Sequence, residues 1–112
     1  IEINKDSVKC AKKNIKDNNI SNYKIIKGDA SLLKKDNYDV IVVDPPRSGL
    51  AEKVISTLNE INCKKLIYIS CNPSTLKRDV NSLDKYKINN MEVFNMFPGT
   101  KHVETICVFE RK

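Results

Sequence analysis

The feature that most constrains the fold is a run of four β-branched residues that ends in prolines. The segment YDVIVVDPP contains the unbroken run Val40–Val43, and Pro45 and Pro46 follow after one residue. Such a run is typical of a parallel strand that is buried on both faces of a sheet. Proline has no backbone N–H to donate to a strand ladder, so we expect the strand to end there.

Strand-like and helix-like segments alternate along the rest of the chain. Apolar residues recur at helical spacing in three segments, namely 6–19, 50–61 and 72–83. Six short apolar segments are predicted to be strands, namely 1–3, 23–29, 38–43, 65–71, 90–97 and 103–111. This alternation predicts an α/β fold, in which a mostly parallel sheet carries helices on both faces.

Local signals mark where some of these elements begin and end. Asp6 or Ser7 is placed to cap the first helix. Asn72 is placed to cap the third helix, with Pro73 at its first position, where proline is favoured. The segment 98–102, PGTKH, is short enough to join the last two strands as an antiparallel hairpin, which would add one antiparallel strand at an end of the sheet.

Composition narrows the functional classes. With 112 residues the chain is expected to form one domain, and its net charge of +6 is compatible with a polyanion partner, although the lysines are spread along the chain. The four cysteines have no C-x-x-C spacing and the chain has one histidine, so no structural zinc site is expected. The cysteines are isolated, and the sequence shows neither a signal peptide nor an apolar run long enough to span a membrane. We therefore expect a cytoplasmic protein with no membrane partner.

Three polar clusters adjoin the predicted strands, at 44–49, 70–79 and 97–104. The first two follow parallel strands, so they should meet at the carboxyl edge of the sheet, where open α/β sheets hold their sites. The third precedes the last, antiparallel strand and can reach the same edge. One thiol, two carboxylates, an arginine and a histidine can therefore converge.

Each of these residues also has a plainer interpretation. Cys71 could be a small buried hydrophobic residue, and Glu104 a solvated strand residue. Asp44 before two prolines could serve the turn alone. Arg78 could simply pair with Asp79 or with solvent.

Together the clusters are more specific, because DPPRSGL, SCNPSTLKRD and FPGTKHVE follow one another in this order. In order and spacing the chain resembles the RNA 5-methyluridine (uracil-C5) methyltransferase family, which uses S-adenosyl-L-methionine. Many enzymes that methylate amino groups have an aromatic residue after Asp/Asn-Pro-Pro, where this chain has Arg47. The resemblance implies a Rossmann-like class I methyltransferase fold and an RNA partner, either tRNA or rRNA.

The resemblance also implies roles for residues of the reaction itself. Cys71 matches the nucleophile of the family and Glu104 its general base. Arg47 and His102 fall on the side of the RNA substrate, with His102 the alternative base. A cysteine suits addition to a pyrimidine ring because it is nucleophilic even when only partly ionised, and a helix that begins just past it favours the thiolate.

The same resemblance implies a site for the methyl donor. Glu2 matches the acidic residue that holds the ribose hydroxyls of S-adenosyl-L-methionine. Asp29 matches a position near the adenine. Asp44 matches a residue at the junction of the donor and the target base, so it counts as both cofactor-binding and substrate-binding.

One family element is missing from the sequence. The first strand and the Gly-rich turn that cradles the donor are absent, because the three glycines form no G-x-G cluster. Residues 1–112 are therefore expected to be the C-terminal part of a methyltransferase catalytic domain. In the family's sheet this first strand lies in the middle, between the strands that end at Glu2 and at Asp44. Without it, we expect those two strands to rearrange or the fragment to form a homo-oligomer. We also expect the fragment alone to be inactive.

Two other functions stay open at this point. The chain could belong to a Rossmann-like methyltransferase that acts on an amino group, with Cys71 incidental. It could also be a non-catalytic RNA-binding domain on the same scaffold, in which case Cys71 should be buried and unreactive.

Overall fold

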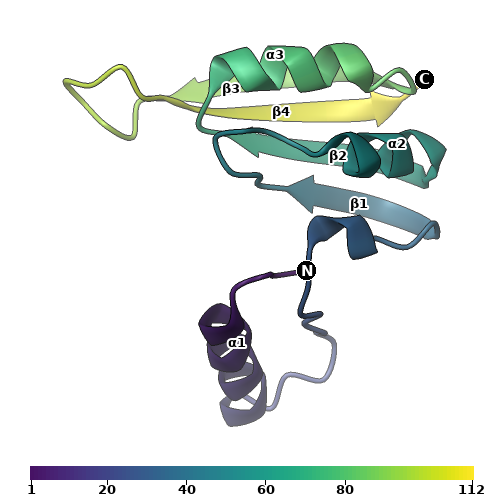
Figure 1. Cartoon of the computed structure of the whole chain (residues 1–112), viewed down its shortest axis with the longest axis vertical. Helices are drawn as coiled ribbons and strands as arrows, with labels where there is room; N and C mark the ends of the chain where they lie inside the picture. The colour runs from purple at the N-terminus through teal and green to yellow at the C-terminus, as the bar shows by residue number, and fades with distance from the viewer. The chain divides into compact units, whose positions relative to one another are not determined.

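A computed structural model describes all residues from 1 to 112 (Figure 1). The elements in chain order are α1 (Lys5–Asp17), the 3-10 helix η1 (Ala30–Leu32), β1 (Asn37–Val43), α2 (Glu52–Glu60), β2 (Asn62–Ser70), α3 (Pro73–Ser82), β3 (Tyr86–Phe94) and β4 (Glu104–Arg111). The chain divides into two compact units, Ile1–Lys34 and Lys35–Lys112. None of the helices has the length and apolarity that crossing a membrane would require.

The first unit contains α1, η1 and very little sheet. The predicted strands 1–3 and 23–29 are reduced to one parallel bridge between Glu2 and Lys27. Two backbone hydrogen bonds hold it, from Glu2 N to Ile26 O at 3.0 Å and from Gly28 N to Glu2 O at 2.9 Å. Two short strands without a third neighbour are only marginally stable, which explains why the ladder does not extend.

The start of α1 differs from the sequence-based expectation. The cap is Asn4, not Asp6 or Ser7, and its side chain accepts hydrogen bonds from the backbone N–H of both of these residues, at 2.9 and 3.0 Å. Asparagine is among the best N-cap residues, so the helix begins at Lys5. The expected apolar face is present, with Val8 buried on it.

The second unit is built on a four-stranded sheet in the order β1-β2-β4-β3. β1 and β2 are parallel, and β4 is antiparallel to both of its neighbours, β2 and β3. Three strands therefore share one direction, as expected for a mostly parallel sheet. β4 lies inside the sheet, between β2 and β3, rather than at its end.

One face of this sheet is covered by both α2 and α3 (Figure 1). The side chains under these helices come from three strands and include Ile41, Leu66, Tyr68, Cys107 and Phe109. Five apolar residues of the segment 50–61, where helical spacing predicted the second helix, are buried: Leu50, Val54, Ile55, Leu58 and Ile61. The core of the second unit thus lies between the two helices and this face.

The opposite face of the sheet is less covered than the sequence suggested. In β1 only Ile41 is buried, while Val40 and Val42 are 48% and 58% exposed. The run Val40–Val43 was expected to be buried on both faces. Within the second unit both helices pack on the same face, and β1 is an edge strand that pairs with β2 alone.

The C-terminal hairpin forms with shifted boundaries. β3 begins at Tyr86, four residues earlier than predicted, and it continues past a register irregularity between Ile88 and Asn90. β3 also ends at Phe94, so the connection to β4 spans 95–103 and is longer than PGTKH. β2 ends at Ser70, which leaves Cys71 just past the strand.

Candidate active site

The polar clusters of the second unit meet at one edge of the sheet. Asp44 directly follows β1, and Cys71 directly follows β2. The antiparallel ladder of β2 and β4 ends with the pair Ser70 and Thr105. Continuing that register by one residue sets Cys71 opposite Glu104, the first residue of β4. The backbone therefore brings the predicted nucleophile and the predicted base to adjacent positions.

Cys71 differs from the other cysteines of the second unit. Cys63 and Cys107 are fully buried, and burial raises the pKa of both thiols. Such thiols are inert at neutral pH and act as packing residues. Cys71 is only partly buried and is not disulfide-bonded. Its placement does not match the fully buried, unreactive cysteine that a non-catalytic binding domain was expected to have.

A tight turn presents Cys71 between β2 and α3. The Ser70 hydroxyl donates to Asn72 O at 3.0 Å and accepts from Asn72 N at 3.1 Å, so both bonds span the cysteine. The Asn72 side chain caps α3 by accepting from Ser74 N at 3.1 Å, with Pro73 in the first turn, as predicted. The cysteine is thus fixed at the N-terminal end of a helix, where the helix dipole favours negative charge.

Side chains of α3 and its cap hold the loop that follows β1. Asn72 Nδ2 and Thr75 Oγ1 both donate to the carbonyl oxygen of Arg47, each at 3.1 Å. Arg78 Nη2 donates to Ser48 O at 2.9 Å. These donors share one side of the helix, because their spacing is three residues. The SCNPSTLKRD and DPPRSGL segments are therefore one connected structure.

A buried carboxylate completes this connection. Asp79 is 0% exposed, and its Oδ2 accepts from Leu50 N at 2.7 Å and from the Tyr68 hydroxyl at 2.6 Å. Arg78 donates to the other oxygen at 2.7 and 2.8 Å. Burial, and then the hydrogen bond to Asp79, raise the pKa of the Tyr68 phenol well above its usual value. With every acceptor satisfied, the carboxylate can remain in the core.

Gly49 lets the loop approach this pair. Its φ is +78°, a left-handed conformation that glycine adopts without strain. A Cβ at this position would lie 2.5 Å from Asp79 Oδ2 and 2.6 Å from Arg78 Nη2. Only a residue without a side chain fits between the loop and α3.

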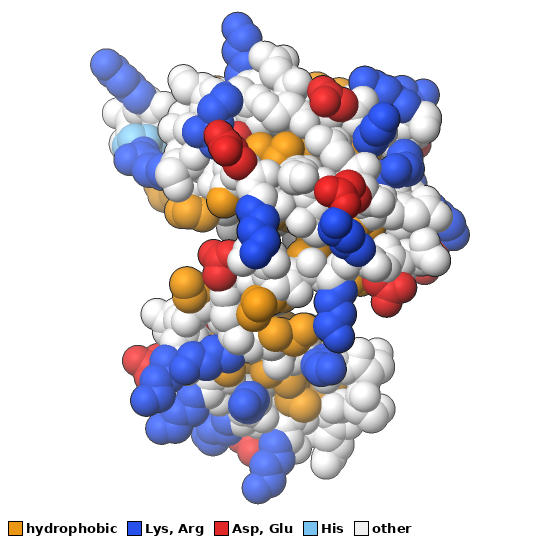
Figure 2. Space-filling view, turned by 45° about the vertical axis from the view of Figure 1, so that its right-hand side comes forward, with side chains coloured by type: hydrophobic (Ala, Val, Ile, Leu, Met, Phe, Trp, Pro, Cys, Tyr) orange, Lys and Arg blue, Asp and Glu red, His pale blue; other side chains and the backbone are white.

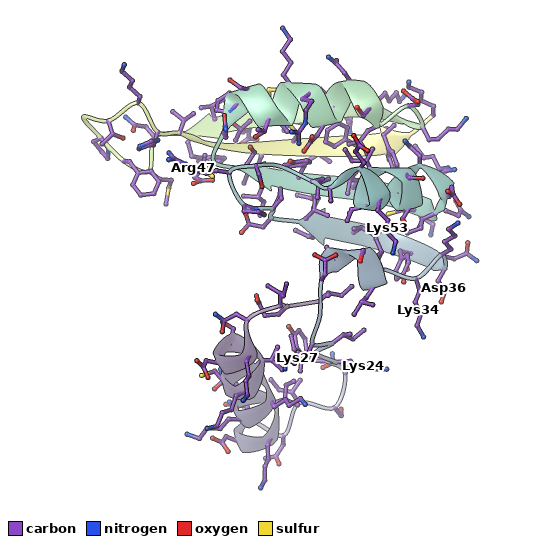
Figure 3. All side chains as sticks on the ribbon, viewed as in Figure 1. Lys24, Lys27, Lys34, Asp36, Arg47 and Lys53 are labelled. Atoms are coloured by element: carbon purple, nitrogen blue, oxygen red, sulfur yellow. The ribbon has the colours of Figure 1, made fainter.

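The third cluster contacts the first through Arg47 and His102. Arg47 Nη2 lies 2.5 Å from His102 Nδ1, within hydrogen-bonding distance of the imidazole ring. The His102 ring also packs edge-on against Phe97, with centroids 6.4 Å apart. Figure 3 labels Arg47 at the carboxyl end of the sheet, beside the base of the β3–β4 loop. These two residues, both expected on the substrate side, are thus brought together.

The remaining predicted residues lie in the first unit. Glu2 is part of the bridge to Lys27, so Glu2 and Asp29 follow adjacent parallel segments. Glu2 Oε1 accepts from Asn4 N at 2.6 Å, and Asp29 Oδ1 accepts from Ser31 N at 2.8 Å and caps η1. Carboxylates accept hydrogen bonds only, which suits the hydroxyl and amino groups of a nucleoside. Glu2 and Asp29 are therefore hydrogen-bond acceptors of the kind that a nucleoside requires.

Sequence reasoning missed the importance of Asp79, Tyr68 and Ser70. From the sequence, Asp79 has a role only as a possible partner of Arg78. A usable signal existed, because Leu76, Asp79 and Leu83 share the helical spacing of the inward face. An acidic residue at such a position indicates a buried, fully hydrogen-bonded carboxylate.

Comparison with known proteins now assigns the family. The family model described as tRNA (Uracil-5-)-methyltransferase matches residues 28–112. The chain belongs to this family. The match covers the loop after β1, the turn at Cys71 and the start of β4, which are the segments that the site joins.

Relatives in other organisms match the whole chain. An uncharacterized RNA methyltransferase of Clostridium acetobutylicum is 38% identical over 100% of this chain, and one of Nanoarchaeum equitans is 41% identical over 99%. The matched regions are 26% and 25% of those proteins. The chain thus spans about a quarter of the length of the relatives it matches.

A solved structure shows the same fold. The crystal structure of Pyrococcus abyssi tRNA (uracil-54, C5)-methyltransferase, in complex with S-adenosyl-L-homocysteine, is 33% identical, with a TM-score of 0.87 over 96% of this chain and 27% of that one. TrmN from Thermus thermophilus superposes with a TM-score of 0.64 over 98% of this chain and 35% of that one, at 15% identity, which concerns the fold alone. The Rossmann-like methyltransferase fold class is confirmed.

Proposed function

We propose that this chain is the C-terminal part of an enzyme that methylates carbon 5 of a uridine in RNA, with S-adenosyl-L-methionine as the methyl donor. The observation that carries the proposal is that the ladder of β2 and β4 ends at the pair Ser70 and Thr105, so that Cys71 and Glu104 are the next residues at the carboxyl edge of the sheet. Family membership supports the reaction class, and the solved relative acts on tRNA. We accordingly favour tRNA over rRNA as the substrate.

In the proposed reaction Cys71 acts first. Its thiolate sulfur adds to carbon 6 of the uracil, and the electrons of the 5,6 double bond move to the carbonyl oxygen as an enolate. Carbon 5 of this enolate is nucleophilic and would form a bond to the methyl carbon of the donor, while the bond from that carbon to the donor sulfur breaks and the sulfur keeps the electron pair as a neutral thioether. The donor, when bound, supplies an electrophilic methyl group on a positively charged sulfur.

Glu104 acts after methyl transfer. Its carboxylate removes the proton from carbon 5, the enolate forms again, and the thiolate leaves as the 5,6 double bond is restored. Glu104 is partly buried, so water around it is reduced. The expected result is 5-methyluridine, with Cys71 regenerated and the proton on Glu104.

Other residues are proposed to bind rather than react. Glu2 would accept hydrogen bonds from the ribose hydroxyls of the donor, and Asp29 would lie near its adenine. Asp44 would stand between the donor and the target base. Arg47, held by His102 and by α3, would orient the RNA.

The 112-residue chain alone is proposed to bind the donor weakly and to methylate nothing, since it is about a quarter of its relatives' length. Isothermal calorimetry with S-adenosyl-L-methionine tests this, and micromolar affinity would contradict it. All four cysteines are free, which suits the proposed cytoplasmic location.

Two substitutions separate the proposed roles, made in a protein that carries this chain together with the remaining length of its relatives. Cys71→Ala should give neither methylated RNA nor a covalent complex. Glu104→Gln should still add and transfer the methyl group, but lose about 10²–10⁴ in the rate of elimination, so that enzyme joined to RNA appears on a denaturing gel.

Matched controls sharpen this test. Glu110→Gln changes a glutamate on the same strand, and Cys10→Ala changes an exposed cysteine; both should leave turnover unchanged. Normal turnover by Glu104→Gln would mean that another group is the general base, and His102 is the first candidate. Activity in Cys71→Ala would favour methylation of an amino group instead.

A further inference from the structure

The positive charge of the chain is concentrated in the first unit. Residues 1–34 contain eight lysines and four acidic residues, a net +4, whereas residues 35–112 contain twelve basic and ten acidic residues, a net +2. Figure 2 shows lysine side chains gathered over one side of this unit. A uniform bias in composition would spread the positive charge in proportion to length, and the charge of this chain is not spread in that way.

Four lysines of α1 form a continuous stripe. Lys5, Lys9, Lys12 and Lys16 follow the spacing i, i+4, i+7 and i+11, which places them within about 60° of one another around a helix. All four are exposed. At about 1.5 Å of rise per residue the stripe is about 16 Å long.

The lysines of this stripe form no ion pairs. Asp17 makes an ion pair with Lys13, at 3.7 Å, and none of the four stripe lysines has an ion-pair partner. Asp6 precedes Lys9 by three residues, a spacing at which helix side chains are neighbours, but the two form no ion pair. Like charges at this spacing repel one another, so the four lysines make α1 less stable when nothing is bound to them. A bound polyanion would remove that repulsion.

We propose that the stripe Lys5, Lys9, Lys12 and Lys16 binds the phosphate backbone of the RNA substrate. The inference rests on the proposed function, which makes RNA the polyanion that this protein meets. Phosphates follow one another along an RNA strand at intervals of a few ångströms, so a stripe of this length can follow several of them in a row. Lysine contacts of this kind position the RNA and add no sequence specificity.

The test compares two variants of the 112-residue chain that lose the same charge. The stripe variant replaces Lys5, Lys9, Lys12 and Lys16 by Gln. The control variant replaces four exposed lysines of the second unit by Gln, namely Lys53, Lys77, Lys85 and Lys87. Binding of a fluorescein-labelled RNA stem-loop is followed by fluorescence anisotropy over a series of KCl concentrations.

The stripe variant should bind more weakly, and the slope of log K against log salt should fall by about 3, since each phosphate contact contributes about 0.7–0.9. The control variant should keep most of the slope. Replacing the same four residues by Arg should restore both affinity and slope, because the charge returns.

Three results would overturn the proposal. Equal losses in the stripe and control variants would mean that net charge alone attracts RNA. Failure of the Arg variant to bind would mean that the lysines act through the structure of α1. Tighter, stripe-dependent binding to phosphatidylserine vesicles than to RNA would assign the stripe to a membrane surface. The proposed reaction is tested by a different measurement, the covalent adduct at Cys71. A failure of the stripe proposal can therefore be distinguished from a failure of the proposed reaction.

Discussion

The two units of the chain differ in what they bury. The second unit has a four-stranded sheet, two helices and nearly all of the buried apolar side chains. The first unit has one amphipathic helix, one isolated bridge and a single buried hydrophobic side chain, Val8. The proposed catalytic residues Cys71 and Glu104 lie in the second unit, beside its core, and the stripe of lysines lies on the exposed helix of the first unit. Precise chemistry needs side chains that a core holds in place, whereas binding to phosphates needs exposed charge.

The largest expected effect comes from separating the two units. Residues 35–112 alone should keep a cooperative unfolding transition, because their sheet and core are internal to the unit. Residues 1–34 alone should show little helix, since α1 has 13 residues and helices shorter than about 12–15 residues are marginal in water. Circular dichroism of the two pieces checks both statements. A cooperative melt of 1–34 would remove the difference between the units.

The next effect concerns the buried carboxylate of the second unit. Asp79→Ala leaves Leu50 N and the Tyr68 hydroxyl without their acceptor, and the free energy of unfolding should fall by about 3 kcal/mol. Asp84→Ala, at an exposed aspartate, should change it by less than about 0.5 kcal/mol. Urea denaturation measures both. Equal small effects would mean that the loop does not depend on α3.

Alkaline pH should weaken the second unit in particular. Burial raises the pKa of Tyr68, Cys63 and Cys107, so the folded state keeps these protons longer than the unfolded state. The stability they contribute is complete below about pH 8, and it falls as the pH rises past the unfolded values of about 8.5 for Cys and about 10 for Tyr. Tyr68→Phe should flatten the loss above about pH 10. Stability that stays constant up to that pH would refute the assignment.

The smallest expected effect is confined to the first unit. Asn4→Ala removes the acceptor for Asp6 N and Ser7 N, and it should destabilise α1 by about 1 kcal/mol. Amide hydrogen exchange should speed up in Lys5–Asp17 and stay unchanged in β2. Asn14→Ala, within the helix, is the control and should not speed exchange. Faster exchange in both units would show that they unfold together.

The sequence predicted elements that have strong local signals. The β-branched run of β1, the amphipathic pattern of α2 and the Asn72-Pro73 start of α3 were all correct. The errors occur where burial or strand formation depends on neighbouring elements of the fold. Val40 and Val42 are exposed because nothing in the second unit covers that face, and 23–29 is not a strand because a ladder needs partners.

The candidate site shows the same division. The clusters around Asp44, Cys71 and Glu104 were found from the strands that they adjoin, since strand direction alone brings them to one edge. The insertion of β4 beside β2, which sets Glu104 opposite Cys71, depends on strand order and could not be read from local pattern. The contact between Arg47 and His102 is likewise a product of tertiary structure.

The central claim is that the thiol at the end of β2 adds to carbon 6 of uracil. The most direct measurement uses RNA that contains 5-fluorouridine, with S-adenosyl-L-methionine and the protein extended to the length of its relatives. Fluorine at carbon 5 cannot be removed as a proton, so the adduct persists through denaturation. We expect a protein–RNA band whose cross-linked peptide contains Cys71; the band should be absent in Cys71→Ala and present in Cys10→Ala. Methylation of uridine RNA by the same preparation, with no adduct on the fluorinated RNA or with an adduct at another residue, would contradict it.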